Sequence, residues 1–400
     1  MNTMKKITIL FVLIVGGLFS SVNGQSPLSI GQVLQMIEEN NKELQGNSQL
    51  AVSRKLEAKA DNNLPDPSVS YTHQYGNKEG LGIQGELEVT QAFDFPTVYA
   101  QRGKLAKTKA ANLDYQQAGL RQQILLNAKE LCLDLVLLNK QKELLLQRLS
   151  NVEKLAGLYA TRLSNGDANV LETNKIDLEL LNVKTAVRRN AAAIVQKQQA
   201  LEALNGGGGI PVAGLAYDDL DTLPPFDAIR SDAFALDPSL LALKSEEAVA
   251  RQALNVNKSQ WLPDLSLGYR LNTTTGGERF NGFIAGVSIP LFSNRHHVRK
   301  AKAEVIYSGL KYENASTTTE KELYQLYHQA TSLKESMTEY SRLLKNKENL
   351  SLLYTALNAG EISMIEYFVE VASLYDSLDN YMQLENDFQK AFARLLKFRL

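Results

Sequence analysis

The feature that most constrains the fold is a long stretch of the chain without proline. No proline lies between Pro96 and Pro211, and the stretch is rich in Leu, Ala, Lys, Glu and Gln, which favour helix. Apolar residues recur within it at heptad spacing, the pattern of helices that wind around one another with a left-handed twist. They are Ile124, Leu131, Leu138, Leu145, Val152 and Tyr159, with Leu135, Leu149, Ala156 and Leu163 at the intervening position. A helix over residues 97–163 would extend about 100 Å, which is longer than a globular core. The sequence therefore predicts coiled-coil packing.

A turn interrupts this helical stretch. The segment "LSNGD", 163–167, contains Asn-Gly, which favours a left-handed backbone, and we expect Asp167 to cap the next helix. The segment "LNAGE", 357–361, has the same pattern near the C-terminus. The sequence therefore predicts two helix reversals of one kind.

The chain is written twice. The segment "LPDPSVSY" from Leu64 matches "LPDLSLGY" from Leu262, and the other matched segments are also about 194–198 residues apart. We therefore expect repeats over 25–204 and 227–400, joined by a Gly- and Pro-containing linker over 205–226. The elements expected in the first repeat are a helix over 29–61, strands over 68–75 and 83–95, and helices over 97–163 and 167–204. Those expected in the second are a helix over 227–259, strands over 265–272 and 280–290, and helices over 294–357 and 361–397.

The N-terminus predicts export from the cytoplasm. Lys5 and Lys6 precede the apolar run "ITILFVLIVGGLF" and then small and polar residues, so residues 1–24 are predicted to be a signal peptide cleaved after Gly24. The run is too short for a comfortable membrane-spanning helix. The lone Cys132 has no partner for an intrachain disulfide, and we expect it to be a small buried apolar residue.

The four strand segments alternate apolar and polar residues. Tyr71 and Tyr75, for example, alternate with Thr72 and Gln74. The pattern suits a membrane barrel with its apolar face outward, and equally a small soluble sheet with one buried face. Four strands cannot close a membrane barrel, which needs about eight, so a barrel would require several chains. Three chains would supply twelve strands.

The sequence lacks the residue patterns that several classes of function require. The formal net charge is −1, Lys and Arg are spread along the chain, and no basic patch interleaved with aromatic residues stands out, so we predict no nucleic-acid binding. His296 and His297 are adjacent, which does not point both side chains of a regular element at one metal ion. "GGGG" at Gly206 lacks the Lys and Ser/Thr of a phosphate-binding loop. We therefore predict no enzyme activity and no cofactor.

At this point the sequence resembles the TolC family of outer-membrane efflux proteins over almost the whole chain beyond the signal peptide. The resemblance rests on the order and duplication of "LSIGQVLQMIEENNKELQ", "ALDPSLLALKSEEAVARQALNVNKSQWLPDLSLGY", "VSIPLFSNRHHVRKAKAE" and the two turns. It implies a mainly α fold with a small β part, assembled as a homotrimer. That homotrimer has a twelve-stranded barrel in the outer-membrane lipid and an α-helical tunnel across the periplasm. It also implies a periplasmic adaptor protein and an inner-membrane pump of the RND or ABC type as partners.

The resemblance also implies roles for individual residues. Adaptor contact at the tunnel tips falls on Leu163, Ser164, Asn165, Gly166, Asp167, Leu357, Asn358, Ala359, Gly360 and Glu361. Glu366 matches an acidic residue that rings the closed periplasmic entrance. The family's second acidic position falls on Val369, and Glu370, one turn beyond Glu366, is our second candidate for the constriction. Glu172 holds the equivalent place in the first repeat, where we expect a salt bridge between helices.

Two other functions remain open at this point. The same architecture could serve as the outer-membrane channel of a type I protein-secretion system. In a different class, the chain could be an exported structural coiled-coil protein whose strands form a soluble sheet; such a protein would show no membrane fractionation and no conductance.

Overall fold

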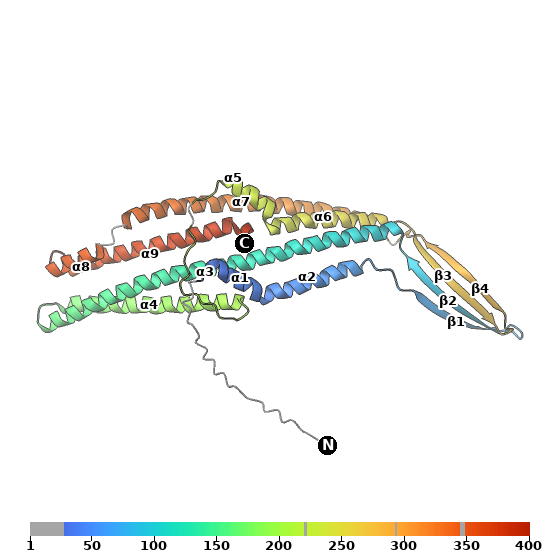
Figure 1. Cartoon of the computed structure of the whole chain (residues 1–400), viewed down its shortest axis with the longest axis horizontal. Coiled ribbons are helices and arrows are strands. Elements are labelled where there is room, and N and C mark those ends of the chain that lie inside the picture. Colours follow the sequence, from blue (N-terminus) through green and yellow to red (C-terminus); the bar gives the residue numbers. More distant parts are fainter. Residues whose placement is uncertain (1–27, 220–221, 293, 345–348) are drawn as a thin grey trace, which may run out of the picture.

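The molecule is a long helical body with a small sheet at one end (Figure 1). The computed structural model describes residues 28–219, 222–292, 294–344 and 349–400. Helix α3, Pro96–Ser164, runs from the sheet to the far end of the body. Each of its ten heptad residues is buried or half-buried, which confirms the predicted packing stripe. The fold class predicted from the sequence, mainly helical with a small sheet, is confirmed, and the predicted signal peptide lies outside the described residues.

The two halves of the chain have the same order of elements. The first comprises α1 (Ile30–Asn40), α2 (Lys42–Ala60), β1 (Ser68–Tyr75), β2 (Ile83–Phe93), α3 and α4 (Val170–Leu204). The second comprises α5 (Phe226–Leu236), α6 (Pro238–Ser259), β3 (Asp264–Thr274), β4 (Arg279–Ser288), α7 (His297–Leu344), α8 (Asn349–Ala359), α9 (Met364–Leu395) and the short 3₁₀ helix η1 (Lys397–Arg399). The helix expected over 294–357 is thus described as α7 and α8, and their junction lies outside the described residues.

The first helix of each half is broken, which corrects the prediction of single helices over 29–61 and 227–259. Asn41 has an extended backbone, and its side chain accepts a hydrogen bond from the backbone N–H of Leu44, so it caps α2. Asp237 caps α6 in the same way through the N–H of Ser239, and Pro238 follows it. Asn and Asp compete with helical hydrogen bonding through their own side chains, and proline at the first helical position cannot continue a preceding helix.

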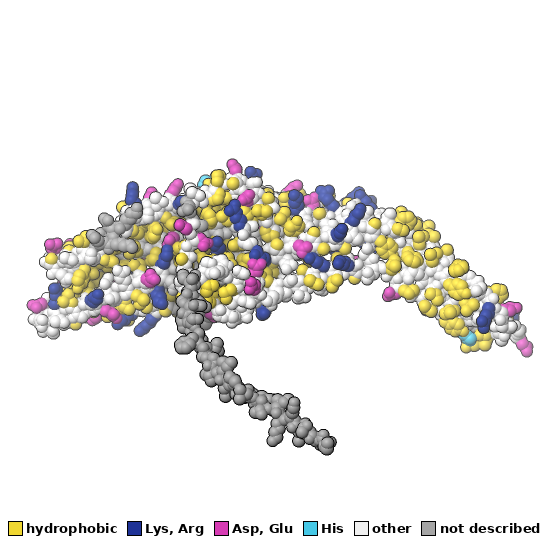
Figure 2. All heavy atoms as spheres, in the orientation of Figure 1, with side chains coloured by type: hydrophobic (Ala, Val, Ile, Leu, Met, Phe, Trp, Pro, Cys, Tyr) yellow, Lys and Arg dark blue, Asp and Glu magenta, His cyan; other side chains and the backbone are white. Residues whose placement is uncertain are grey.

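The strands form one antiparallel sheet in the order β1-β2-β3-β4. Its central pair joins the two halves, since Leu87 of β2 lies opposite Leu271 of β3. The apolar face is uncovered: Phe283 is 93% exposed and Tyr75 is 76% exposed. Figure 2 shows hydrophobic side chains spread over this end of the molecule. The sheet therefore lacks a protein layer on its apolar face, and its two outer strands pair on one side only among the described residues.

Among the described residues, three separate clusters of buried side chains hold the helical body along its length. The first joins α1, α3 and α4 in the middle of the body and includes Leu133, Ile37 and Leu201. Cys132 lies fully buried in it, as predicted, and desolvation raises the pKa of its thiol to about 12. The second joins α3, α4, α8 and α9 at the turn end. The third packs α5 and α7 against α9. This succession of small cores fits the predicted coiled-coil packing.

Candidate functional site at the turn end of the helical body

Both helix reversals lie at the end of the body farthest from the sheet (Figure 1). At the first, Gly166 has φ +81°, and the N–H of Asp167 donates to the carbonyl of Arg162 at 2.8 Å. At the second, Gly360 has φ +74°, and the N–H of Glu361 donates to the carbonyl of Ala356 at 2.9 Å. This is the hydrogen-bond pattern of a helix ended by a left-handed glycine. The left-handed glycines predicted at the two reversals are confirmed.

The residue that starts the next helix differs from the prediction. Asn169, not Asp167, caps α4: its side chain accepts from the N–H of Leu171 at 2.9 Å. Ser363 caps α9 through the N–H of Glu366 at 3.2 Å. The cap lies three residues beyond the glycine because the chain needs that length to reverse before a new helical turn can form.

The glutamates singled out from the sequence have an immediate local role in both turns. The Glu366 carboxylate accepts from the backbone N–H of Ser363 at 2.7 Å, and the Glu172 carboxylate accepts from that of Asn169 at 3.1 Å. Each is therefore the third helical residue of a capping box. The hydrogen bonds from Ser363 hold the pKa of Glu366 below its usual value. Glu172 makes no ion pair to another helix among the described residues of one chain, so the salt bridge between helices stays a prediction.

The remaining predicted tip residues divide by exposure. Ser164, Asn165, Asn358 and Ala359 are exposed, like the two glycines and the acids that follow them, whereas Leu163 is half-buried. Leu357 is buried in the core of the turn end, so its side chain packs inward and does not present a contact surface. Glu370 is exposed one turn along α9 from Glu366. Apart from Leu357, contact with a partner stays a prediction for these residues.

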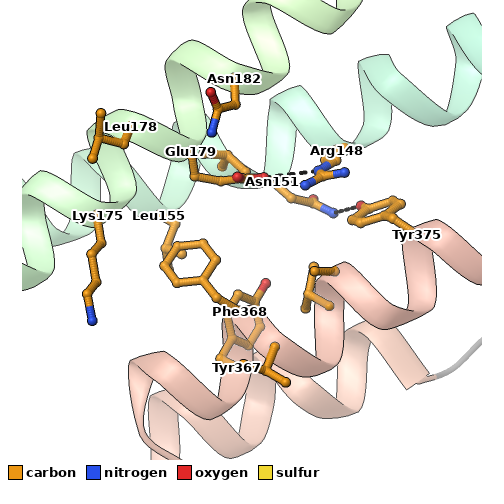
Figure 3. Close-up of a pocket in the computed structure, with 14 residues that line it drawn as sticks. Arg148, Asn151, Leu155, Lys175, Leu178, Glu179, Asn182, Tyr367, Phe368 and Tyr375 are labelled. Carbon is orange, nitrogen blue, oxygen red and sulfur yellow. Dashed lines mark hydrogen bonds and ion pairs between the residues drawn. The ribbon is translucent and has the colours of Figure 1, made fainter.

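Sequence reasoning missed a polar junction just behind the turns, where the α3–α4 hairpin meets α9 (Figure 3). Arg148 Nη2 lies 2.6 Å from Glu179 Oε1, and the Arg148 guanidinium lies 5.0 Å from the centre of the Tyr375 ring. Asn151 Nδ2 donates to the Tyr375 hydroxyl at 3.4 Å. These residues line a cleft of about 410 Å³ whose other walls are mainly apolar. Burial raises the pKa of Tyr367, which lies on the same face of α9, to about 12.

The sequence did carry a signal for this junction. Tyr367, Val371, Tyr375 and Leu378 follow the spacing of one helix face. Their partners on α3 and α4 could not be found by spacing alone, because the contacts join distant parts of the chain: Asn151 and Tyr375, for example, are 224 positions apart.

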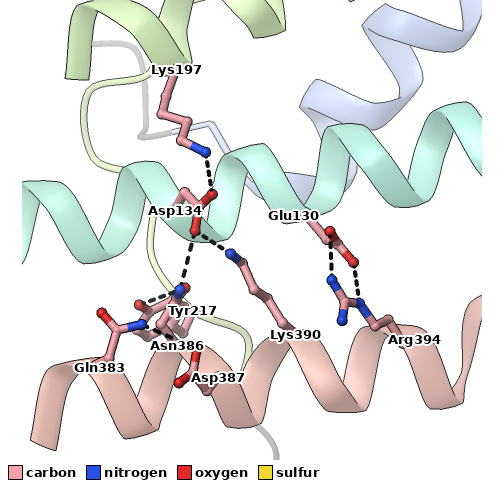
Figure 4. Close-up of polar contacts among 9 residues, drawn as sticks. All are labelled: Glu130, Asp134, Lys197, Tyr217, Gln383, Asn386, Asp387, Lys390 and Arg394. Atoms are coloured by element: carbon pink, nitrogen blue, oxygen red, sulfur yellow. Dashed lines mark hydrogen bonds and ion pairs between the residues drawn. The ribbon is translucent and has the colours of Figure 1, made fainter. Parts of the chain in front are cut away.

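A second polar cluster ties the middle of the body together (Figure 4). Asp134 of α3 accepts hydrogen bonds from Lys197 of α4 at 2.8 Å, from Asn386 of α9 at 3.2 Å and from Lys390 of α9. Tyr217, from the segment between α4 and α5, donates to Asn386 at 3.3 Å. Burial alone would raise the pKa of Asp134, but the hydrogen bonds from Lys197 and Lys390 outweigh it and hold the pKa below its usual value.

The polar clusters among the described residues consist mainly of hydrogen bonds and ion pairs between helices. Within these residues no group of three or more His, Cys, Asp or Glu side chains is arranged to hold a metal ion. None of the helices in the described ranges combines the length and apolar character needed to cross a membrane.

Comparisons with known proteins agree with this architecture. A family model described as outer membrane efflux protein matches residues 229–398. A membrane protein from Pseudomonas aeruginosa has a TM-score of 0.78 and 16% identity, covering 92% of this chain and 93% of that one. The outer membrane protein VceC from Vibrio cholerae has a TM-score of 0.76 and 14% identity, covering 92% and 96%. The Campylobacter jejuni CmeC outer membrane channel has a TM-score of 0.73 and 14% identity, covering 92% and 85%. No curated protein matches the sequence.

Proposed function

We propose that this chain, whose residues 229–398 belong to the outer membrane efflux protein family, is the passive outer-membrane channel of a tripartite efflux system. The match of residues 229–398 to that family model supports the family predicted from the sequence and, with it, an outer-membrane location and a role other than catalysis. The proposal adds that the channel is a homotrimer. It also adds that the energy for export comes from an inner-membrane pump of the RND or ABC type, reached through a periplasmic adaptor.

The open, uncovered sheet is the observation that carries the proposal. Its polar face holds Arg270 between Glu86 and Glu88, and its opposite face presents Val69, Tyr269 and Phe283 to the exterior. In lipid, the unpaired backbone N–H and C=O groups at the edges of β1 and β4 would cost too much free energy for the sheet to remain open, because the bilayer core offers no hydrogen-bond partner. Three copies pairing β4 of one chain with β1 of the next would close twelve strands, above the minimum of about eight for a membrane barrel.

The length of the helical body supports a role across the periplasm. Helix α3 has 69 residues and therefore extends about 100 Å, more than twice the thickness of a bilayer. A sheet anchored in the outer membrane would hold the two turns far from that membrane, facing the inner-membrane components. Exposed apolar side chains such as Leu171 and Ile365 flank the turns and suit contact with a second protein.

The first prediction tests assembly and conduction together. We expect the detergent-extracted protein to contain three chains by native mass measurement, and the same material to conduct ions in planar bilayers. Replacing Tyr71 of β1 and Phe283 of β4 by Asp should abolish both, because these side chains lie mid-strand on the exposed apolar face, where a charge facing lipid costs most. Ser70→Asp and Gly282→Asp on the opposite face serve as the matched control and should preserve trimers. A monomer that stays soluble without detergent would contradict the proposal and favour an exported structural protein.

The second prediction separates the two roles of Glu366. Gln at this position can still complete a capping box but carries no charge. If three copies of Glu366 ring the entrance, Glu366→Gln should weaken the cation preference and the block by multivalent cations in planar bilayers at low salt. Glu366→Ala should do the same and also lower thermal stability. Since the Glu366 pKa is depressed, its own stabilisation is present at neutral pH and is lost as pH falls below about 4.5.

Two further variants complete this test. Glu172→Gln, at the equivalent capping box of the first repeat, should leave ion selectivity unchanged. Adding Glu370→Gln to Glu366→Gln should enlarge the effect only if both side chains face the pore. Unchanged selectivity in Glu366→Gln would reduce Glu366 to a helix cap and move the constriction elsewhere.

A further inference from the structure

Lysine and arginine are spread along the chain, but few acidic residues accompany them where the helical body meets the sheet. α3 begins at Pro96, just after β2 ends at Phe93, and α7 begins at His297, nine residues after β4 ends at Ser288. The chain has no acidic residue over 95–113 or over 289–303. Figure 2 shows dark blue side chains on the helices adjoining the sheet. We define the basic collar as five exposed cations of these two segments: Lys104, Lys107, Arg295, Arg299 and Lys302.

The five cations of the basic collar have no ion-pair partner among the described residues. Three nearby acids are engaged elsewhere: Asp94 pairs with Arg102, Asp61 with Lys109, and Asp114 with Lys55. Asp66 and Asp264, beside the starts of β1 and β3, form no ion pair within the described part of the chain, so the five cations of the collar still outnumber the unpaired acids at the junction.

The collar is also placed against the helix dipole. Arg299 lies in the first turn of α7, and that turn contains no acidic residue. A helix N-terminus carries partial positive charge and unsatisfied N–H groups, so cations there are unfavourable and anions are favourable. An anion from outside the chain would relieve both the repulsion and the unpaired charge.

Exposed apolar side chains lie on the sheet side of the collar. Trp261, Leu291 and Phe292 are 50%, 67% and 82% exposed. The Asn294 side chain donates to the carbonyl of Gln260, which holds the Trp261 segment beside the segment that leads into Arg295. Aromatic side chains beside unpaired cations are typical of the interface between a membrane and water.

The spacing along α7 matches a headgroup layer. Arg299 and Lys302 lie about 3 and 8 Å along the helix axis from His297. The polar layer on one side of a bilayer is about 5–7 Å thick, and long cationic side chains reach further still. Lys104 and Lys107, further along α3, lie within about two Debye lengths of the same surface at physiological salt.

We propose that the basic collar binds the phosphate headgroups of anionic phospholipids in the periplasm-facing leaflet of the outer membrane. The proposal rests on the proposed function, which places the sheet in that membrane. Arginine recognises phosphate through paired N–H donors and lysine through its compact charge. The collar thereby fixes the depth at which the helical body leaves the bilayer.

Trp261 is the one tryptophan in the chain, so it reports on its surroundings without labelling. The trimer is reconstituted into phosphatidylcholine vesicles that contain a minor fraction of phosphatidylglycerol. One of the two lipids is brominated near the headgroup end of its acyl chains, and quenching of Trp261 gives the relative association of each lipid. We expect a preference for phosphatidylglycerol of about threefold or more at low salt, which declines in high salt because screening weakens the attraction.

The test variant is Arg295→Gln, Arg299→Gln and Lys302→Gln together, for which the preference should fall to about one. The matched control removes three exposed cations of the helical body far from the sheet, Lys142, Lys154 and Arg188, and should retain the wild-type preference. Equal quenching by the two lipids in the wild-type protein would overturn the collar while leaving the channel intact. Quenching by neither lipid in vesicles that conduct ions would place Trp261 away from lipid and also overturn the collar. Vesicles with neither quenching nor conductance would contradict the proposed function itself.

Discussion

Asp134→Ala is expected to lower the free energy of local unfolding in the middle of the helical body by about 3 kcal/mol. The reason is that it leaves two lysines and an asparagine without their shared hydrogen-bond acceptor. The Asp134 side chain is only 16% exposed, so water replaces little of what is lost. Native-state hydrogen exchange of the protein should show amides of α3 and α9 near Asp134 exchanging about a hundredfold faster than in the wild type.

A neighbouring ion pair supplies the matched control. Glu130, one turn earlier on α3, bonds Arg394 of α9 at 2.6 Å, but that arginine is 49% exposed (Figure 4). Glu130→Ala should therefore lower the free energy of local opening, as measured by hydrogen exchange, by only about 0–1 kcal/mol. Similar effects for the two variants would show that the Asp134 cluster stabilises the body no more than an exposed ion pair does.

The Asp134 effect also has a defined pH dependence. Because its pKa is depressed in the folded protein, its stabilisation is complete above the ordinary value of 3.8 and is lost as pH falls through the lower folded value. The difference between wild type and Asp134→Ala should therefore be constant near neutral pH and shrink below about pH 4.

Replacing Gly166 and Gly360 together by Val is expected to abolish export while most of the trimer still forms. Both glycines have positive φ, and a left-handed residue with a branched side chain costs about 1–2 kcal/mol at each turn. A Cβ atom at either position would meet no atom within 4 Å, so the cost is confined to the backbone of the turn. The test is to measure, in the same cells, resistance to an exported compound and the amount of trimer, for the variant and the wild type.

Two controls isolate the backbone as the cause. Gly157 of α3 also has open space for a Cβ atom and lacks a positive φ, so Gly157→Val should leave export intact. Asparagine tolerates the left-handed region, so the double replacement by Asn should export better than the double replacement by Val. Normal export by the Val variant at normal trimer abundance would mean that the two turns do not form the adaptor contact.

The parts of the fold that could be predicted are those set by local pattern. The proline-free heptads fixed the course of α3, and period-two alternation located all four strands to within a few residues. The breaks at Asn41 and Asp237 carry only weak local signals, a single Asn and an Asp-Pro pair, within segments whose other residues favour helix, so spacing alone does not reveal them. The register of β2 against β3 depends on contacts between the two halves, which no single segment encodes.

The candidate site was less predictable, for a physical reason. Glu172 and Glu366 stand out in the sequence through their repeated place after a glycine, but a capping box and a pore charge need the same residue type at the same position. The Asp134 cluster and the Arg148–Tyr375 junction depend on which helices become neighbours in space. That choice is made by tertiary packing, so spacing along one helix could not reveal it.

The pairing of β2 with β3 sets the order in which the parts of the sheet can form during folding. β1 and β2 are joined by a short connection, and so are β3 and β4, so each hairpin can form as soon as it is made. The seam between the hairpins joins partners such as Glu88 and Arg270, which are 182 residues apart. Contacts of such sequence separation form late, because a long loop must close first. The first hairpin must therefore wait, with an unpaired edge, until nearly three-quarters of the chain has been synthesised and exported, which makes this interval the natural point for chaperone protection.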